Sequence, residues 1–119
     1  MNSSRTWNAS WSGKAVGGNR RLDTARGRIY RSAAYRVFLE ELACTFGTVD
    51  PGAHFERPVT VYIQQHVNGR RDVDSLIKPV LDALERSGVI ASDNLVREIR
   101  VMRQAKDGGP DRLYVEVTG

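Results

Sequence analysis

The sequence has little cysteine and no long apolar run. Cys44 is its only cysteine, which excludes a disulfide within the chain and a zinc site built from several cysteines. No apolar segment approaches the ~20 residues that span a bilayer, and the first residues do not form the apolar core of a signal peptide. We therefore expect a cytoplasmic protein without a membrane segment.

The length of the chain limits how many domains it can form. With 119 residues it can bury enough apolar surface for one modest core. We therefore interpret residues 1–119 as a single domain, in which residues 1–28 form a basic segment that can be flexible.

The basic residues are concentrated near the N-terminus, although the net charge is only +4. Residues 1–38 contain eight basic residues and one acidic residue, whereas residues 39–119 contain ten basic and thirteen acidic residues. A segment this basic attracts the phosphates of nucleic acid. The alternative is a solvated, partly disordered arm, and charge alone does not separate the two.

The first half of the chain predicts one strand and one helix. An extended segment is expected near residues 6–12, followed by a basic loop. Ser32 can cap a helix, apolar residues then recur at helical spacing up to Phe46, and Gly47 can end it. We expect a helix over residues 33–46. Trp7, Trp11 and Tyr30 can stack on bases, but core or dimer packing is favoured.

The second half predicts three strands and a second helix. Residues 59–67 alternate apolar and polar, as in a half-buried strand. Residues 96–103 and 113–118 read as two further strands, joined by a turn-rich hairpin loop. The resulting order is β-α-β-α-β-β, which is a small α+β domain.

The second helix follows an acidic motif and has one polar face. Asp74, Lys78, Asp82 and Glu85 recur at spacings that place them on one side. Pro79 is unfavourable beyond a first turn, so either the regular helix begins only near residues 75–76 or it kinks. Gly88 is expected to end this helix.

The acidic motif has the residue types of a magnesium site. Asp72 and Asp74 can lean toward one Mg²⁺, because this hard cation prefers carboxylate oxygens. We expect Asp93 as the third acid, on the assumption that an antiparallel return brings it back to the helix start. Lys78 lies one turn after Asp74 and can reach a phosphate, and Arg70 and Arg71 can hold flanking phosphates.

Simpler interpretations remain open for the same residues. Asp72 or Asp74 can serve only as a helix cap, and Lys78 can pair with Asp74 or Asp82 along the helix. A calcium-binding EF-hand loop is excluded, because Leu76 and Ile77 stand where a third oxygen ligand and a glycine are required.

The spacing of the whole motif resembles a known family. The residues concerned are Arg71-Asp72-x-Asp74-x3-Lys78-x3-Asp82-Ala83-Leu84-x3-Gly88-x4-Asp93, about a fifth of the chain. This block resembles the RusA family of Holliday junction resolvases, which are small homodimeric magnesium-dependent endonucleases. The match departs at Ser75, where the family commonly has asparagine, and at Ser92, where it often has aspartate.

The resemblance implies a fold, a site and a substrate. It implies a mixed β-sheet with two principal helices, Asp72, Asp74 and Asp93 as metal-binding acids, and Lys78 as the catalytic lysine. It also implies a homodimer that nicks opposed strands of a four-way DNA junction. The expected DNA-binding surface comprises Lys14, Arg20, Arg21, Arg26, Arg28, Arg70 and Arg71. The alternatives are a noncatalytic nucleic-acid-binding module and a nuclease for other branched DNA.

Overall fold

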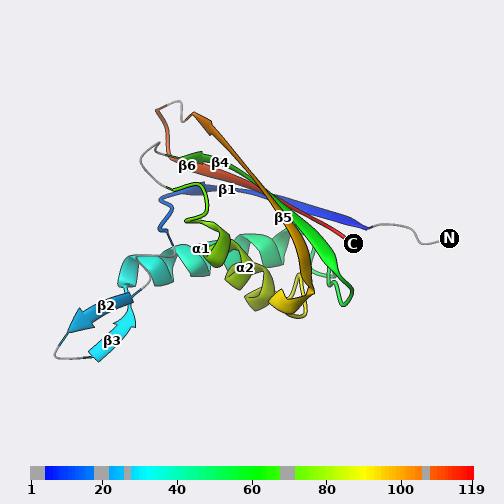
Figure 1. Cartoon of the computed structure of the whole chain (residues 1–119), viewed down its shortest axis with the longest axis horizontal. Helices are drawn as coiled ribbons and strands as arrows, with labels where there is room; N and C mark the ends of the chain where they lie inside the picture. Colours follow the sequence, from blue (N-terminus) through cyan, green and yellow to red (C-terminus); the bar gives the residue numbers. More distant parts are fainter. Residues whose placement is uncertain (1–4, 18–21, 26–27, 68–71, 106–107) are drawn as a thin grey trace.

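The computed structural model describes residues 5–17, 22–25, 28–67, 72–105 and 108–119, without the side chains of residues 22–31 and 105 (Figure 1). Its elements, in chain order, are β1 (Thr6–Gly13), β2 (Leu22–Ala25), β3 (Arg28–Arg31), α1 (Ala33–Val49), β4 (Val59–Val67), α2 (Ile77–Arg86), the 3-10 helix η2 (Asp93–Leu95), β5 (Val96–Ala105) and β6 (Asp111–Thr118).

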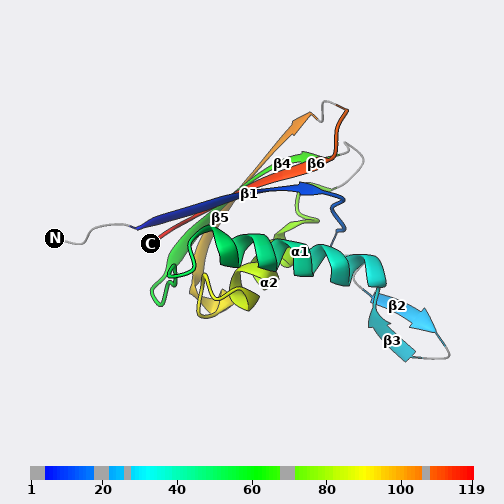
Figure 2. The ribbon, with the colours of Figure 1, turned by 180° about the vertical axis from the view of Figure 1, so that it is seen from behind.

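The main sheet is mixed and has four strands in the order β1-β6-β4-β5. β5 runs parallel to β4, whereas β6 is antiparallel to both of its neighbours. Both α1 and α2 lie on the same side of this sheet, as Figures 1 and 2 show from opposite directions. The predicted β-α-β-α-β-β order and the small α+β fold are confirmed, with β2, β3 and η2 as additions.

The predicted hairpin between the last two strands is wrong. β4 lies between β5 and β6 and pairs with both. The physical reason is burial. β4 buries every second residue against the helices, and a position between two other strands keeps this apolar strand away from the exposed edges of the sheet. The turn-forming residues before β6 describe a local bend but do not determine which strands become neighbours.

The basic region before α1 contains a short hairpin where we expected a loop. β2 and β3 pair antiparallel, from Leu22 opposite Arg31 to Ala25 opposite Arg28. This hairpin extends beyond the start of α1, away from the main sheet (Figure 2). Strands of four residues are too short for their alternation to stand out in the sequence.

Helix α1 begins as predicted but ends later. The Ser32 hydroxyl accepts a hydrogen bond from the Tyr35 N–H at 3.1 Å, which confirms the expected cap. The helix continues through Gly47 to Val49, so the predicted glycine stop is wrong. Gly47 lies near the residue that follows α2, and a Cβ added to it would make an ordinary contact with the Ser87 Cβ at 3.8 Å.

The core lies between the two helices and the sheet. The Trp7 and Phe46 ring centroids are 5.2 Å apart in an edge-on contact, and those of Trp11 and Phe38 are 4.9 Å apart. Trp7 is 3% exposed and Trp11 is 6% exposed, so both tryptophans are core residues and base stacking is excluded for them. The side chain of Tyr30 lies outside the described residues.

Helix α2 accommodates its proline by starting late. It begins at Ile77, so Pro79 is its third residue and occupies the first turn, where the backbone N–H has no partner within the helix. The predicted late start is therefore confirmed. Gly88 has a φ of 85° and follows the end of the helix as predicted.

Two glycines next to these helix ends are expected to respond oppositely to alanine. Gly47→Ala should raise the free energy of unfolding by about 0.5–1 kcal/mol, because the site is helical and the added Cβ makes an ordinary contact. Gly88→Ala should lower it by about 1–2 kcal/mol, because the left-handed backbone strains any Cβ. Urea unfolding of both variants measures the two values. Changes of the same sign in the free energy of unfolding of both variants would contradict these backbone assignments for Gly47 and Gly88.

Candidate functional site

Asp72 and Asp74 lie on an exposed turn that leads from β4 into α2. The Ser75 N–H donates to the Asp72 carbonyl at 3.0 Å, and the Ile77 N–H donates to the Asp74 carbonyl at 3.2 Å. Both side chains are exposed, and neither carboxylate has a hydrogen-bond or ion-pair partner among the described residues. The residue that caps α2 is Leu76, with no side-chain hydrogen bond, so the helix-cap interpretation of these aspartates is wrong.

A buried glutamine ties this acidic turn to the sheet. Gln65 is fully buried on the helix side of β4, and its Nε2 donates to the Val73 carbonyl at 2.7 Å. Its Oε1 is buried without a partner among the described residues. A polar side chain is unfavourable there unless it is hydrogen-bonded, so this contact holds the turn in place. The signal in the sequence is a single polar residue in the buried register of β4.

Lys78 pairs with Asp82 along α2. Their Nζ and Oδ1 atoms are 3.0 Å apart, and the two side chains are 49% and 21% exposed. The Tyr35 hydroxyl donates to the other oxygen of Asp82 at 3.2 Å, which links α1 to the same group. Of the pairings left open, Asp82 is therefore the partner of Lys78. Tyr35 carries no sequence signal, because it lies 47 residues from Asp82.

Asp93 lies at the other end of α2 from Asp72 and Asp74. It begins η2, beyond the C-terminal end of the helix, and its N–H donates to Glu85 Oε2 at 2.7 Å. The ten residues of α2 are about 15 Å long. The expected antiparallel return is wrong, because β5 runs parallel to β4 and begins beside Val59. The metal-binding role of Asp93 stays a prediction.

The acidic turn has the donors that a hard cation requires. Two carboxylates one residue apart suit Mg²⁺, which usually keeps several waters and takes one or two protein carboxylates. Within the described parts of the chain, no three His, Cys, Asp or Glu side chains gather closely enough to share a metal ion. A third protein ligand beside Asp72 and Asp74 would therefore have to come from outside the described residues of this chain.

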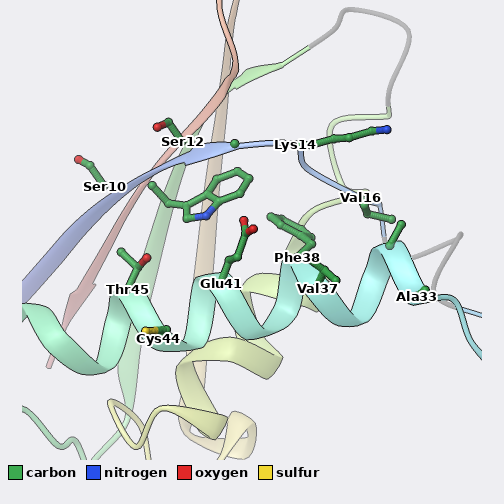
Figure 3. A pocket seen from close by; sticks show the side chains of 13 residues that line it. Ser10, Ser12, Lys14, Val16, Ala33, Val37, Phe38, Glu41, Cys44 and Thr45 are labelled. Atoms are coloured by element: carbon green, nitrogen blue, oxygen red, sulfur yellow. The ribbon is translucent and has the colours of Figure 1, made fainter.

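Most of the expected DNA-binding residues are not placed by the structure. Arg20, Arg21, Arg26, Arg70 and Arg71 lie outside the described residues, as does the side chain of Arg28. Lys14 is exposed after β1, at the rim of a hollow of about 760 Å³ between β1 and α1. Figure 3 shows Lys14 pointing away from this hollow, whose lining includes Glu41 but none of the predicted catalytic acids.

The helices of the described chain include none that is long and apolar enough to cross a membrane.

Comparison with known proteins indicates the family of the chain. The sequence model of the family described as Endodeoxyribonuclease RusA matches residues 13–118. The Crossover junction endodeoxyribonuclease RusA of Aquifex aeolicus (strain VF5) is 36% identical over 39 residues, which are 33% of this chain and 31% of that protein. The family match covers most of the chain, and the chain therefore belongs to the RusA endodeoxyribonuclease family.

Proposed function

We propose that the chain is an endodeoxyribonuclease that resolves four-way DNA junctions by paired, symmetric nicks, with Mg²⁺ as its cofactor. The observation that carries this proposal is the family match over residues 13–118. The exposed pair Asp72 and Asp74 on the turn before α2, followed by Lys78 in the first turn of that helix, is consistent with such chemistry.

Each residue of the site has a distinct part in this proposal. Asp72 and Asp74 would hold Mg²⁺, which supplies positive charge for the phosphate and eases deprotonation of water. The Lys78 ammonium can contact a phosphate oxygen and offset the negative charge that develops there. Asp82 holds Lys78, and the Tyr35 hydroxyl in turn holds Asp82. Asp82 and Tyr35 together thus orient the Lys78 ammonium before DNA binds.

The DNA itself would be bound through its phosphates. The residues proposed for this are Lys14, Arg20, Arg21, Arg26, Arg28, Arg70 and Arg71. Binding through phosphate contacts weakens steeply as salt rises, because the contacts release counterions. In this proposal the protein acts in the cytoplasm as a homodimer, so that two sites can meet the two opposed strands of a junction.

The experiment that tests the activity uses a labelled synthetic four-way junction and a linear duplex with the same sequences. With Mg²⁺ we expect paired nicks at symmetric positions in the junction and little cleavage of the duplex, and chelation of the metal should abolish the nicks. Equal cleavage of both substrates, or an uncut junction, would contradict the proposal.

A noncatalytic binding module is the second candidate, favoured by one observation. No three potential metal ligands gather within the described part of one chain. Such a module would retard the junction in a gel but leave it uncut with either Mg²⁺ or Mn²⁺. A flap substrate in the same assay separates a junction resolvase from a nuclease that acts on other branched DNA.

Gln65→Leu is expected to reduce cleavage without unfolding the protein. Loss of the Nε2 contact to Val73 frees the acidic turn, and we expect cleavage to fall about tenfold. The free energy of unfolding should change by less than about 1 kcal/mol, because the substitution also removes the buried, unpartnered Oε1. The matched control is Gln64→Leu, on the opposite face of β4, which should cleave like the wild type. Unchanged cleavage by Gln65→Leu would contradict a positioning role.

A further inference from the structure

Strand β1 has an edge whose backbone groups are unpaired. In the described chain it pairs only with β6. Arg5 and Gly119 exchange two backbone hydrogen bonds, at 2.9 and 3.0 Å, so the alternation of an antiparallel ladder places the bonded pairs at the odd-numbered residues of β1. The N–H and C=O groups of Ser10 and Ser12 consequently point away from β6, without a partner among the described residues. β1 also contains no proline or charged residue that would oppose the addition of a strand.

The hollow of about 760 Å³ between β1 and α1 lies beside this edge and has a partly apolar lining. Val37 and Cys44 line it from α1, and both are exposed, Val37 to 56%. The buried rings of Trp11 and Phe38, with centroids 4.9 Å apart, line it as well. A strand added to the edge of β1 would lie over this side of α1 and cover its exposed apolar side chains.

One acidic side chain points into the hollow. Figure 3 shows the Glu41 carboxylate between α1 and β1, and it forms no ion pair or hydrogen bond with a described residue. Lys14 points away from the hollow, and the hydroxyls of Ser10 and Ser12 lie on the open face of the sheet. An unpaired carboxylate attracts a cation and repels a DNA phosphate. The hollow is therefore unsuited to the DNA backbone.

These features together suit an extended peptide that carries a basic side chain. Such a peptide supplies the backbone partners that Ser10 and Ser12 lack, and its alternate side chains point toward α1. Val37 and Glu41 are about 6 Å apart along the helix axis, whereas alternate side chains of a strand are about 6.7 Å apart. Because β1 and α1 lie alongside each other (Figure 2), one apolar and one basic side chain of the same peptide can meet these two residues.

We propose that the edge of β1 binds an extended segment of a partner protein as an added strand, and that an arginine or lysine of this segment pairs with Glu41. The binding site is separate from the acidic turn, which the lining of the hollow does not include. The proposal is therefore independent of DNA cleavage.

Fluorescence anisotropy with labelled synthetic peptides tests the charge preference. The probe alternates threonine with valine over about seven residues, a common strand length, and has arginine in place of its central valine. Matched peptides carry leucine or glutamate at that place. We expect the arginine peptide to bind most tightly and the glutamate peptide to have a Kd at least about tenfold higher. Equal binding of the three peptides, or no binding of the arginine peptide, would overturn the proposal.

Glu41→Gln tests whether this carboxylate causes the preference. The variant should bind the arginine and leucine peptides with Kd values within about twofold of each other. The matched control is Glu40→Gln, which removes an exposed acid of the same helix outside the hollow and should keep the wild-type preference. A preference for arginine that persists in Glu41→Gln would refute the pairing with Glu41.

Ser10→Pro tests whether the peptide pairs with the edge. The substitution removes an N–H that faces the hollow but no hydrogen bond to β6, so the sheet should be retained, which urea unfolding checks. The Kd of the arginine peptide should rise at least about tenfold, whereas Ser10→Ala, which alters only the open face, should bind like the wild type. Methylation of alternate backbone nitrogens of the peptide gives the same test with the protein unaltered. A methylated peptide that binds in both methylation patterns would exclude strand addition.

Two other occupants of the hollow predict different results. If a second copy of the chain binds there, Glu41→Gln and Ser10→Pro weaken self-association in sedimentation. If junction DNA binds there, a saturating amount of the junction displaces the arginine peptide. We expect unchanged self-association and no displacement, and either contrary result would assign the hollow to that occupant. A protein that binds the peptide as expected but never cuts a junction would refute only the proposed function.

Discussion

Asp72→Asn is expected to lower the single-turnover rate of junction cleavage at least about a thousandfold while leaving junction binding intact. The amide keeps the shape of the carboxylate but removes the negative charge that would hold the cation. Because the Asp72 side chain is exposed and has no partner among the described residues, the free energy of unfolding should change by less than about 0.5 kcal/mol.

The matched control for this substitution is Glu40→Gln. Glu40 is also an exposed acid, but it lies on α1. The control should cleave at the wild-type rate, and both variants should retard the junction equally in a gel without divalent metal. Equal cleavage by Asp72→Asn and the wild type would remove Asp72 from the site. Loss of binding together with cleavage would instead indicate a role in folding or DNA contact.

Lys78→Gln is expected to lower the same rate about a hundredfold, because a positive charge next to the reacting phosphate is removed. The substitution breaks the 3.0 Å ion pair between Lys78 and Asp82. Because the lysine side chain is half exposed, this ion pair stabilises the fold by no more than about 1 kcal/mol. In this variant the Asp82 carboxylate still accepts the hydrogen bond from the Tyr35 hydroxyl. The protein should consequently remain folded.

Single-turnover kinetics and gel retardation separate the possible roles of this lysine. The control is Arg86→Gln, which removes an exposed positive charge from the last turn of the same helix. If Lys78 stabilises the developing charge, cleavage falls and the junction Kd stays within about twofold. A rise in Kd with an unchanged rate of cleavage would show that Lys78 only anchors the DNA.

Local patterns predicted most elements of this fold. Alternation over Val59–Val67 identified β4, and Ser32 with the apolar residues after it identified the start of α1. These features depend on neighbours in the chain and are therefore visible in the sequence. The stop at Gly47 was wrong because the packing of α1 against α2 and β1 outweighs the weak helix preference of one glycine.

The site was predictable only in part, for a related reason. The spacing predicted Asp72 and Asp74 where an extended segment enters a helix, and the structure places both on the turn before α2. Asp74 was also expected on the polar face of the helix with Lys78, but the helix begins only at Ile77, so Asp74 lies outside it. The partner of Lys78 was one of two local alternatives. The contacts of Gln65 and Tyr35 join separate elements, and no local spacing predicts them.

The sequence by itself determined the four strands of the main sheet, the two helices, the acidic motif and the family to which that motif points. Only the tertiary structure decided which strands are neighbours, because strand order depends on how whole faces are buried and not on the loops between them. The parallel placement of β5 beside β4 is the decisive case. It separates Asp93 from Asp72 and Asp74 within one chain, and it places β5 at an edge of the sheet.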